Sequence, residues 1–369
     1  MKVLVIGTLP SSLHNFRGKL LQHIKSKDNQ VVALTSGANT SDISSVEELG
    51  AEYIDYPVNR SGLSPTQDFK TFVALHNIFK KQQPNVILAY TIKPIIWGAF
   101  AARCLPNCRF YALVTGLGFA FQKGGWKKNL LMKLVIFLYK TALKRADKII
   151  FQNPDNRQVF IDLGIVPEYK TAVVNGSGVD ITHFEVKPLP STPTFLLIAR
   201  LLGDKGIREY IKAANIVKQK YPEAIFQLVG PEDPSPDGIS LEELTSLNQN
   251  NSVDYLGGTD DVRPFIEGCS IFVLPSYHEG LPRTVLEAMA TGRPILTTDV
   301  PGCRETVIYS ENGWLVEKSN VEQLAEKMTW FIENQAEWQR MAKASREMVE
   351  DKFDVHKVNA ELLKIMELH

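Results

Sequence analysis

The sequence has few of the features that mark several common protein classes. Its four cysteines among 369 residues are too few and too scattered for a disulfide framework or a zinc site, so we expect reduced thiols. Its longest apolar run, residues 129–139, contains a lysine and is well short of the roughly 20 residues that span a bilayer. The N-terminal apolar segment is too short for a signal peptide and predicts a buried first strand. We therefore expect a protein that is soluble or attached to one membrane face.

Net charge is also absent, because 41 Lys and Arg balance 41 Asp and Glu. This balance argues against a strongly basic nucleic-acid binder and against an acidic disordered chain. The total conceals a split: residues 1–187 hold 23 basic and 13 acidic side chains, net +10, and residues 188–369 hold 18 and 28, net −10. The length suits two domains, and the split suggests that they have different neighbours.

Short apolar strands alternate with amphipathic helical segments along most of the chain. In the first half, strands are predicted at residues 2–7, 31–35, 52–56, 85–90, 109–114, 148–153 and 171–175. Several are apolar at consecutive positions, as parallel strands buried on both faces must be. After a proline-rich segment at 184–193, a second series is predicted at 194–199, 225–230, 253–257, 271–275, 294–298 and 313–316, and only helical patterns follow.

This order predicts an α/β protein of two doubly wound, Rossmann-like domains that face an interdomain cleft, with helices at the C-terminus. We place the N-terminal domain at 1–187, the C-terminal domain at 188–350, and a final helix at 351–369 that packs back on the N-terminal domain. Ligands of such sheets bind beyond the carboxyl ends of the strands, so the cleft is the expected site.

The segment 270–307 has the strongest functional signal. A buried strand ends at Pro275, a loop carries Glu279 and Gly280, and a helix is predicted to start near Pro282. Proline suits the first helical turn, where its missing N–H is no loss. The backbone amides of that turn favour an anion such as a phosphate, and they belong to Leu281, Arg283 and Thr284.

Two glutamates lie on either side of this helix start. Glu279 precedes it and Glu287 lies about one and a half turns inside it. Both can reach one elongated ligand, and carboxylates accept hydrogen bonds from sugar and ribose hydroxyls. The structural alternative is that Glu279 complements the helix dipole and that Glu287 lies on a solvated face. The apolar and small neighbours at 286–294 disfavour a solvated face for Glu287.

The Glu279-x7-Glu287 spacing, with Gly280 and a small-residue helix after a buried strand, resembles the signature of the retaining glycosyltransferases of family 4, which have the GT-B fold. The chain is similar in particular to bacterial enzymes that extend undecaprenyl-diphosphate-linked sugars, a group that includes N-acetylgalactosamine transferases acting on diacetylbacillosamine. The segments behind this closer likeness are 13–24, 89–103, 112–122 and 274–307.

Other segments resemble the same family. Segment 196–206 places Arg200 and Lys205 where the family holds the donor pyrophosphate. Two cations beside a glycine-containing turn suit a diphosphate, and an ordinary surface pair is the alternative. Residues 173–184 resemble the family's hinge, and residues 253–276 resemble the stretch that lines the nucleotide base.

The resemblance implies a role for each matching residue. The catalytic residues would be Glu279, Arg200 and Lys205, and the donor would be bound by Glu287, Gly280, Leu281, Arg283 and Thr284. The donor would be a UDP-sugar, and no cofactor or metal is expected. The sequence agrees, since it has no Asp-x-Asp loop and no His and carboxylate cluster.

The N-terminal half departs from the family in two places. The first strand–helix loop, residues 7–16, lacks the paired glycines that many members place near the donor phosphate, and the fifth strand is not followed by the family's histidine. We expect His14 and Arg17 after the first strand, and Lys93 after the fourth, to bind an acceptor diphosphate. Loop or surface roles for these three residues are the alternative.

The segment 123–148 has eight Lys and Arg and one acid, Asp147, so it supplies +7 of the +10 in its half of the chain. Cations mixed with aromatic residues are typical of a helix lying on an anionic membrane, where each basic residue contributes roughly 1 kcal/mol. A core-packed helix with a solvated basic face is the alternative, and nucleic acid is disfavoured because no recognised nucleic-acid fold accompanies the patch. We expect membrane contact through Trp126, Lys127, Lys128 and Lys133.

The sequence therefore predicts a retaining glycosyltransferase, peripheral on the inner face of the bacterial cytoplasmic membrane. It would move a sugar, an N-acetylhexosamine, from a UDP-sugar to a polyprenyl-diphosphate-linked saccharide in glycan, O-antigen or capsule assembly or in protein glycosylation. A GT-B sugar-nucleotide epimerase and a glycosyltransferase with a soluble acceptor remain alternatives. A dehydrogenase is disfavoured because no G-x-G-x-x-G follows a strand, and a periplasmic-type binding protein because no signal peptide is predicted.

Overall fold

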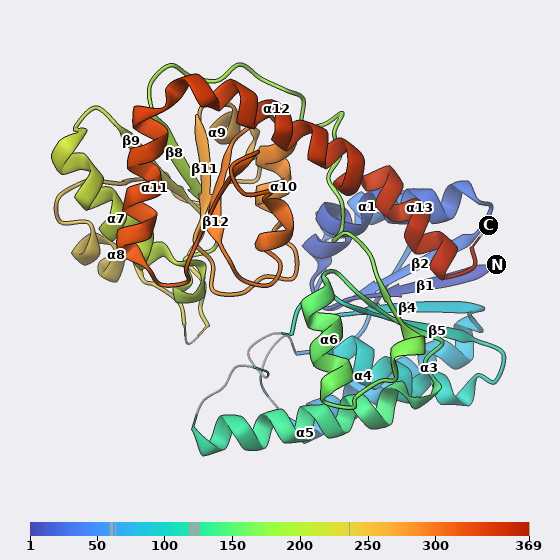
Figure 1. Ribbon diagram of the computed structural model, residues 1–369. Helices are drawn as coiled ribbons and strands as arrows, with labels where there is room; N and C mark the ends of the chain where they lie inside the picture. The colour runs from blue at the N-terminus through green and yellow to red at the C-terminus, as the bar shows by residue number, and fades with distance from the viewer. Residues whose placement is uncertain (60–61, 63, 118–120, 122–124, 236, 369) are drawn as a thin grey trace. The chain divides into compact units, whose positions relative to one another are not determined.

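The computed structural model describes residues 1–369 except 60–61, 63, 118–120, 122–124, 236 and 369 (Figure 1). The chain divides into two compact units, one of residues 1–177 with 356–369 and one of residues 178–355. Each unit contains one parallel sheet, which confirms the predicted α/β class with C-terminal helices. Among the described helices, none has the length and hydropathy of a membrane span.

The sheet of the first unit has the strand order β3-β2-β1-β4-β5-β6-β7 and is parallel throughout. Its central strands are apolar on both faces, and the side chains of β1 from Val3 to Ile6 are completely buried. The strands are β1 (Lys2–Ile6), β2 (Gln30–Thr35), β3 (Glu52–Asp55), β4 (Val86–Tyr90), β5 (Arg109–Val114), β6 (Lys148–Phe151) and β7 (Thr171–Val173).

Helices cover both faces of this sheet. One hydrophobic core joins one face to α3, α4, α5 and α6, and a second core joins the opposite face to α1, α2 and α13. Figure 1 shows α1 and α13 on one side of the strands and α3, α4 and α5 on the other. The helices are α1 (Pro10–Ser26), α2 (Thr40–Glu48), α3 (Pro65–Gln82), α4 (Ile92–Ala101), α5 (Trp126–Ala142), α6 (Pro154–Asp162) and α13 (Val355–Ile365), with 3-10 turns at Ala102–Cys104, Leu143–Arg145 and Glu168–Lys170.

The second unit repeats the architecture with the strand order β10-β9-β8-β11-β12-β13. Its strands are β8 (Thr194–Ile198), β9 (Ile225–Val229), β10 (Asp254–Tyr255), β11 (Ile271–Leu274), β12 (Ile295–Thr298) and β13 (Gly313–Val316). Its helices are α7 (Ile207–Lys220), α8 (Leu241–Leu247), α9 (Arg263–Glu267), α10 (Arg283–Ala290), α11 (Val321–Glu333) and α12 (Trp338–Met348), with 3-10 turns at Gly203–Lys205, Arg304–Thr306 and Gln335–Glu337 and a π-helical segment at Val349–Phe353.

Both sheets reverse their strand order at one point, between β1 and β4 in the first unit and between β8 and β11 in the second. Chains leaving the carboxyl ends of such a pair diverge to opposite faces, which leaves room for a ligand. Arg200 and Lys205 follow β8 and Glu279 follows β11, whereas His14 follows β1 and Lys93 follows β4. These five predicted site residues therefore lie next to these two positions.

Candidate active site

In the second unit, Lys205 and Glu279 meet beyond the carboxyl ends of β8 and β11. Lys205 ends the 3-10 turn Gly203–Lys205, and Glu279 lies in the loop between β11 and α10. The Lys205 Nζ is 2.6 Å from the Glu279 Oε1, and each side chain is 16% exposed. The structure thus brings together two residues that sequence comparison alone placed at one ligand.

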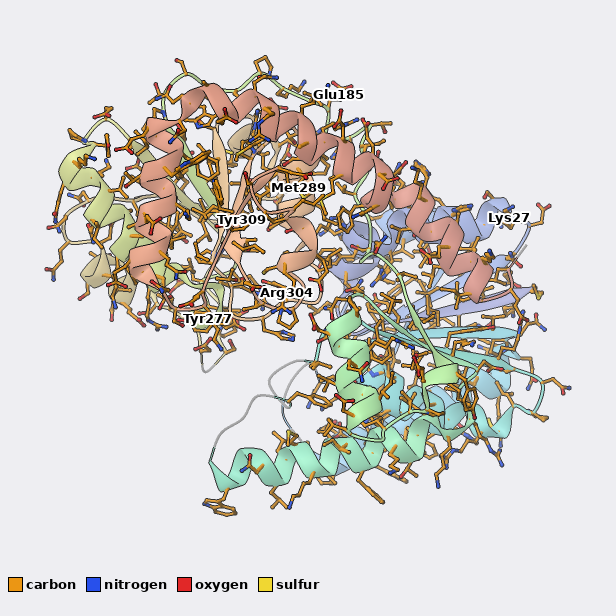
Figure 2. The ribbon with its side chains drawn as sticks, viewed as in Figure 1. Lys27, Glu185, Tyr277, Met289, Arg304 and Tyr309 are labelled. Atoms are coloured by element: carbon orange, nitrogen blue, oxygen red, sulfur yellow. The ribbon has the colours of Figure 1, made fainter. Side chains whose placement is uncertain are left out.

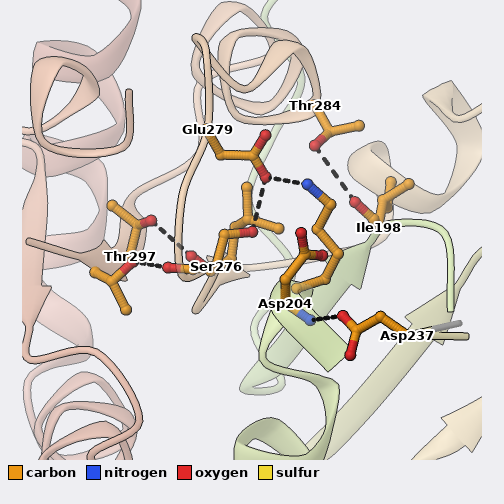
Figure 3. A network of polar contacts seen from close by, with 10 residues as sticks. Ile198, Asp204, Asp237, Ser276, Glu279, Thr284 and Thr297 are labelled. Atoms are coloured by element: carbon orange, nitrogen blue, oxygen red, sulfur yellow. Dashed lines mark hydrogen bonds and ion pairs between the residues drawn. The ribbon is translucent and has the colours of Figure 1, made fainter. Parts of the chain in front are cut away.

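Hydrogen bonds and one close backbone contact fix the loop that carries Glu279. Ser276 Oγ donates to Glu279 Oε1 at 2.8 Å (Figure 3). Thr298 Oγ1 donates to the Ser276 carbonyl. The Glu279 N–H donates to the Pro301 carbonyl at 3.1 Å. Gly302, at φ +86°, lies so near that an added Cβ would be 2.5 Å from the Glu279 carbonyl oxygen and 2.8 Å from that of Gly280. Sequence analysis missed Gly302 as a support for this loop.

The turn that carries Lys205 is fixed by backbone contacts. The Asp204 N–H donates to Asp237 Oδ2 at 2.8 Å, and the Tyr277 N–H donates to the Asp204 carbonyl at 2.8 Å. Gly206 follows at φ +71°, and a Cβ there would be 2.1 Å from the Pro275 carbonyl oxygen. Figure 2 shows Tyr277 and Arg304, which follow β11 and β12, at the same edge of this unit. A side chain larger than hydrogen at Gly206 or Gly302 would therefore clash with the backbone of the neighbouring loop.

Charges at this edge alter the protonation of their neighbours. Burial opposes the charged form of Lys205, but the Glu279 carboxylate outweighs it and raises the pKa of Lys205. Burial lowers the pKa of His278, although Glu279 acts in the opposite direction. Lys205 is therefore a cation at neutral pH, and the lowered pKa keeps His278 neutral there.

Arg200 forms an ion pair that the sequence did not indicate. Its guanidinium contacts the Asp233 carboxylate, whose side chain is only 5% exposed, while Arg200 itself is 44% exposed. Burial opposes ionisation of Asp233, but hydrogen bonds from Ser235 and the charge of Arg200 lower its pKa. In the sequence, Asp233 lies in a short run of acids and prolines at 231–237, which does not reveal its partner.

Helix α10 begins at Arg283, with Pro282 as its N-cap residue, in agreement with the predicted start near Pro282. Glu287 is 7% exposed, and Arg283 Nε donates to its Oε1 at 2.8 Å. Burial raises the pKa of Glu287, although Arg283 opposes the shift. Thr284 Oγ1 donates to the Ile198 carbonyl at 3.4 Å and joins α10 to the end of β8 (Figure 3), and Leu281 packs half-buried against the core.

In the first unit, the expected acceptor residues lie beside the β1 and β4 ends. His14 and Arg17 are on α1, where Arg17 is 4% exposed and its guanidinium is 5.1 Å from the centre of the Tyr90 ring. Lys93, on α4, forms an ion pair of 2.8 Å with the buried Asp68. The Lys93 charge is thus neutralised by a residue of α3 that sequence analysis did not consider.

A strained residue lies at the same edge. Thr91, which precedes α4, has φ +67°, a backbone conformation that branched side chains rarely adopt. Its Oγ1 is 2.7 Å from the Oγ1 of Thr8, which follows β1. Such strain is concentrated at functional sites, and nothing in the local sequence pattern pointed to Thr91.

The remaining expected residues are on α5 of the first unit. Trp126 is 73% exposed and Lys133 is also exposed. Lys127 and Lys128 belong to α5, but their side chains lie outside the described part of the structure. Among the side chains that the structure does describe, no group of three or more His, Cys, Asp or Glu could hold a metal ion.

Comparisons with known proteins match both units. The family described as "Glycosyl transferases group 1" matches residues 180–348, and "Glycosyl transferase 4-like" matches residues 2–153. The chain is 31% identical over 349 residues to the N,N'-diacetylbacillosaminyl-diphospho-undecaprenol alpha-1,3-N-acetylgalactosaminyltransferase of Campylobacter jejuni, covering 91% of this chain and 90% of that protein. It is 24% identical to the capsular polysaccharide glycosyltransferase CapM of Staphylococcus aureus, over 95% and 93% of the two chains.

Solved structures match over the whole chain. Sucrose-phosphate synthase from Thermosynechococcus elongatus has a TM-score of 0.83 at 18% identity, covering 100% of this chain and 98% of that one. HepE from Anabaena in complex with UDP-glucose has a TM-score of 0.80 at 19% identity, covering 100% and 99%. At these identities the likeness concerns the fold.

Proposed function

Because the chain belongs to the group 1 glycosyl transferases of family 4, with the GT-B fold, we propose that it moves a sugar from a UDP-sugar to a polyprenyl-diphosphate-linked saccharide. An N-acetylhexosamine is the proposed sugar, and the reaction keeps the anomeric configuration. The observation that carries the proposal is the Lys205–Glu279 pair at the β8/β11 reversal, beside the N-terminus of α10.

The donor diphosphate would bind between cations and a helix terminus. Arg200 and Lys205 leave β8 at the carboxyl edge, and α10 presents the amides of its first turn at the same edge. Two cations and a helix N-terminus together stabilise a phosphate anion. The Arg200–Asp233 and Lys205–Glu279 pairs supply the cations with counter-charges when the donor is absent.

The proposed chemistry follows from these positions. The bond between the sugar C1 and the β-phosphate oxygen breaks, and the acceptor hydroxyl oxygen bonds to C1 on the same face. The leaving phosphate takes the acceptor's proton, since the sequence offers no clear nucleophile at the reacting face. Arg200 and Lys205 stabilise the charge that develops on the leaving diphosphate. Glu279 positions the donor sugar and Glu287 binds the ribose, so no step requires a metal.

The acceptor is proposed from a relative and from the first unit. The Campylobacter relative is named for a diphospho-undecaprenol acceptor. In this chain His14, Arg17 and Lys93 follow the two strands at the β1/β4 reversal, where an acceptor diphosphate would compete with Asp68 for Lys93. This acceptor places the enzyme at the inner face of the bacterial cytoplasmic membrane, in glycan, O-antigen or capsule assembly or in protein glycosylation.

A product screen tests the proposal. The purified protein is incubated with UDP-, GDP- and ADP-sugars and with lipid-diphosphate or soluble saccharide acceptors, and products are identified by mass. We expect one added N-acetylhexosamine, only with a UDP-sugar and a lipid-diphosphate acceptor. If the donor sugar is epimerised without an acceptor, the protein is an epimerase and the proposed transfer is wrong. If transfer occurs only to soluble saccharides, the acceptor is a soluble saccharide and not a polyprenyl-diphosphate-linked one.

A further inference from the structure

Helix α5 has a second apolar face that the core does not use. The outward side chains Trp126, Leu130 and Phe137 are 73%, 61% and 64% exposed, and Leu134 beside them is 43% exposed. At 100° per residue, positions 126, 130 and 137 fall within one narrow stripe. Large apolar side chains that remain exposed in a continuous stripe indicate an interaction surface.

The opposite face of α5 already anchors the helix to its unit. Val135, Tyr139 and Ala142 are buried in the core that α5 shares with α4 and α6, and Leu131 and Leu138 pack against it. Figure 1 shows α5 along the outer side of this helical layer. The exposed stripe is therefore available to bind a partner while the inner face keeps the helix in place.

Positive charge is interleaved with the apolar stripe. Lys133 and Lys140 lie on the same side of α5, and both are exposed. From 123 to 146 the sequence has no acidic residue, and the carboxylate of Asp147 accepts from the Phe110 N–H at 2.7 Å. A second copy of this face would bring like charges together, which disfavours self-association.

Helix α3 adds exposed apolar residues to the same layer. Phe69 and Val73 are 64% and 38% exposed, and the Phe69 ring centre is 6.2 Å from that of Phe72. Both α3 and α5 pack against α4. As crossover helices of a parallel sheet, they begin at the carboxyl edge of the strands, so these residues lie toward the edge that carries the proposed acceptor residues.

We propose that the stripe Trp126, Leu130, Leu134 and Phe137, with Lys133 and Lys140, binds an anionic phospholipid bilayer. The aromatic and aliphatic side chains enter the boundary between headgroups and acyl chains, and the lysines contact anionic headgroups. This inference rests on the proposed function for its purpose, which is to bring the carboxyl edge of the first unit to a lipid-linked acceptor. The binding itself requires neither donor nor acceptor.

Vesicle flotation tests the surface without any substrate. Wild-type protein is mixed with phosphatidylcholine vesicles that contain roughly one-third phosphatidylglycerol, or none, at low and high salt. We expect binding to the anionic vesicles only, with a fraction that persists at high salt because apolar contacts are not screened. The variant Lys133→Glu with Lys140→Glu should lose at least about 25-fold in affinity.

The apolar part is tested separately. Trp126→Ser, Leu130→Ser and Phe137→Ser together should reduce vesicle affinity at least about tenfold and remove the salt-resistant fraction. Controls change the same number of exposed residues outside the stripe: Lys81→Glu with Lys212→Glu, and Tyr169→Ser with Ile216→Ser and Leu241→Ser. They should bind vesicles as the wild type does. Circular dichroism checks folding, and the charge variant tests the surface even if the apolar variant fails to fold.

The proposal would be overturned if the wild type does not bind anionic vesicles, or if both stripe variants bind them with the affinity of the wild type. It would also be overturned if the protein is a dimer in solution and the apolar variant dissociates that dimer. UDP titration of the same variants separates this surface from the proposed function. If the protein binds vesicles but has no transferase activity, the proposed function is wrong and the proposed membrane surface stands. If it transfers a sugar but binds no vesicle, the proposed function stands and the membrane surface is wrong.

Discussion

Lys205 and Glu279, which follow two different strands of the second unit, form an ion pair of 2.6 Å at the point where the strand order of that sheet reverses. Ser276 donates to the same carboxylate oxygen, and the backbone of Glu279 is held by Pro301. A diphosphate that binds Lys205 must compete with Glu279 for the ammonium group. If the donor binds as proposed, the pair would couple donor binding to the position of the Glu279 carboxylate.

Replacing Glu279 should separate catalysis from nucleotide binding. Glu279→Ala is expected to abolish transfer, a loss of at least about a hundredfold in kcat/KM, while UDP affinity stays within a few-fold because Arg200 and Lys205 remain. Glu279→Gln keeps the shape and should lose activity similarly. Steady-state kinetics and UDP calorimetry measure both quantities, with the exposed Glu223→Ala as a control. Retained turnover in Glu279→Ala would remove Glu279 from the mechanism.

Replacing Asp233 should strengthen nucleotide binding. Asp233 holds the Arg200 guanidinium, so its carboxylate competes with the donor diphosphate. Asp233→Asn keeps the side-chain volume and removes the charge, and we expect UDP to bind a few-fold more tightly in calorimetry. The matched control is Glu337→Gln, which breaks an exposed pair with Arg340 at the start of α12 and should leave affinity unchanged. Weaker UDP binding in Asp233→Asn would mean that Asp233 orients Arg200 for the donor.

Glu287 should make stability depend on pH. Burial raises the pKa of Glu287 above its ordinary 4.5 in the folded protein, although Arg283 opposes the shift. The native state then keeps a proton that the unfolded chain releases, so this group's contribution to the free energy of unfolding falls as the pH rises from 4.5 through the native pKa. Glu287→Gln should gain stability relative to the wild type across that window, and the difference should level off above it.

Urea unfolding of both proteins at several pH values measures this difference. Donor affinity should fall in the same variant, since the amide replaces the carboxylate proposed to bind the ribose. The exposed Glu223→Gln serves as the control and should follow the wild type at every pH. A stability difference that stays constant with pH would contradict the assignment of a raised pKa to Glu287.

Gly302 should be needed for the shape of the Glu279 loop. It has φ +86°, and an added Cβ would be 2.5 Å from the Glu279 carbonyl oxygen. Gly257 has a similar φ of +75° with nothing within 4 Å of an added Cβ. Gly257→Ala should therefore cost only about 1 kcal/mol of backbone strain, whereas Gly302→Ala should cost more stability and also reduce kcat. Thermal unfolding and kinetics compare the two, and equal effects would exclude a role for the close contact.

Much of the fold could be predicted from the sequence because the responsible signals are local. The consecutive apolar residues of β1, β4 and β8 and the helical spacings between them indicate buried parallel strands with crossover helices. The segment around Glu279 and Glu287 could also be predicted from the sequence, because the strand, the loop and the start of α10 are contiguous in the chain. The helix start near Pro282 was predicted correctly, since α10 begins at Arg283 directly after Pro282 as its N-cap.

The sequence by itself determined the α/β class, the family, and the residues that follow β8 and β11. Only the tertiary structure decided which charges neutralise one another: Lys205 with Glu279, Arg200 with Asp233, and Lys93 with Asp68. It also decided which face of α5 is buried and which is left exposed. Helical and strand periodicity depends on neighbouring residues, whereas an ion pair or an exposed stripe depends on which distant segments pack against it.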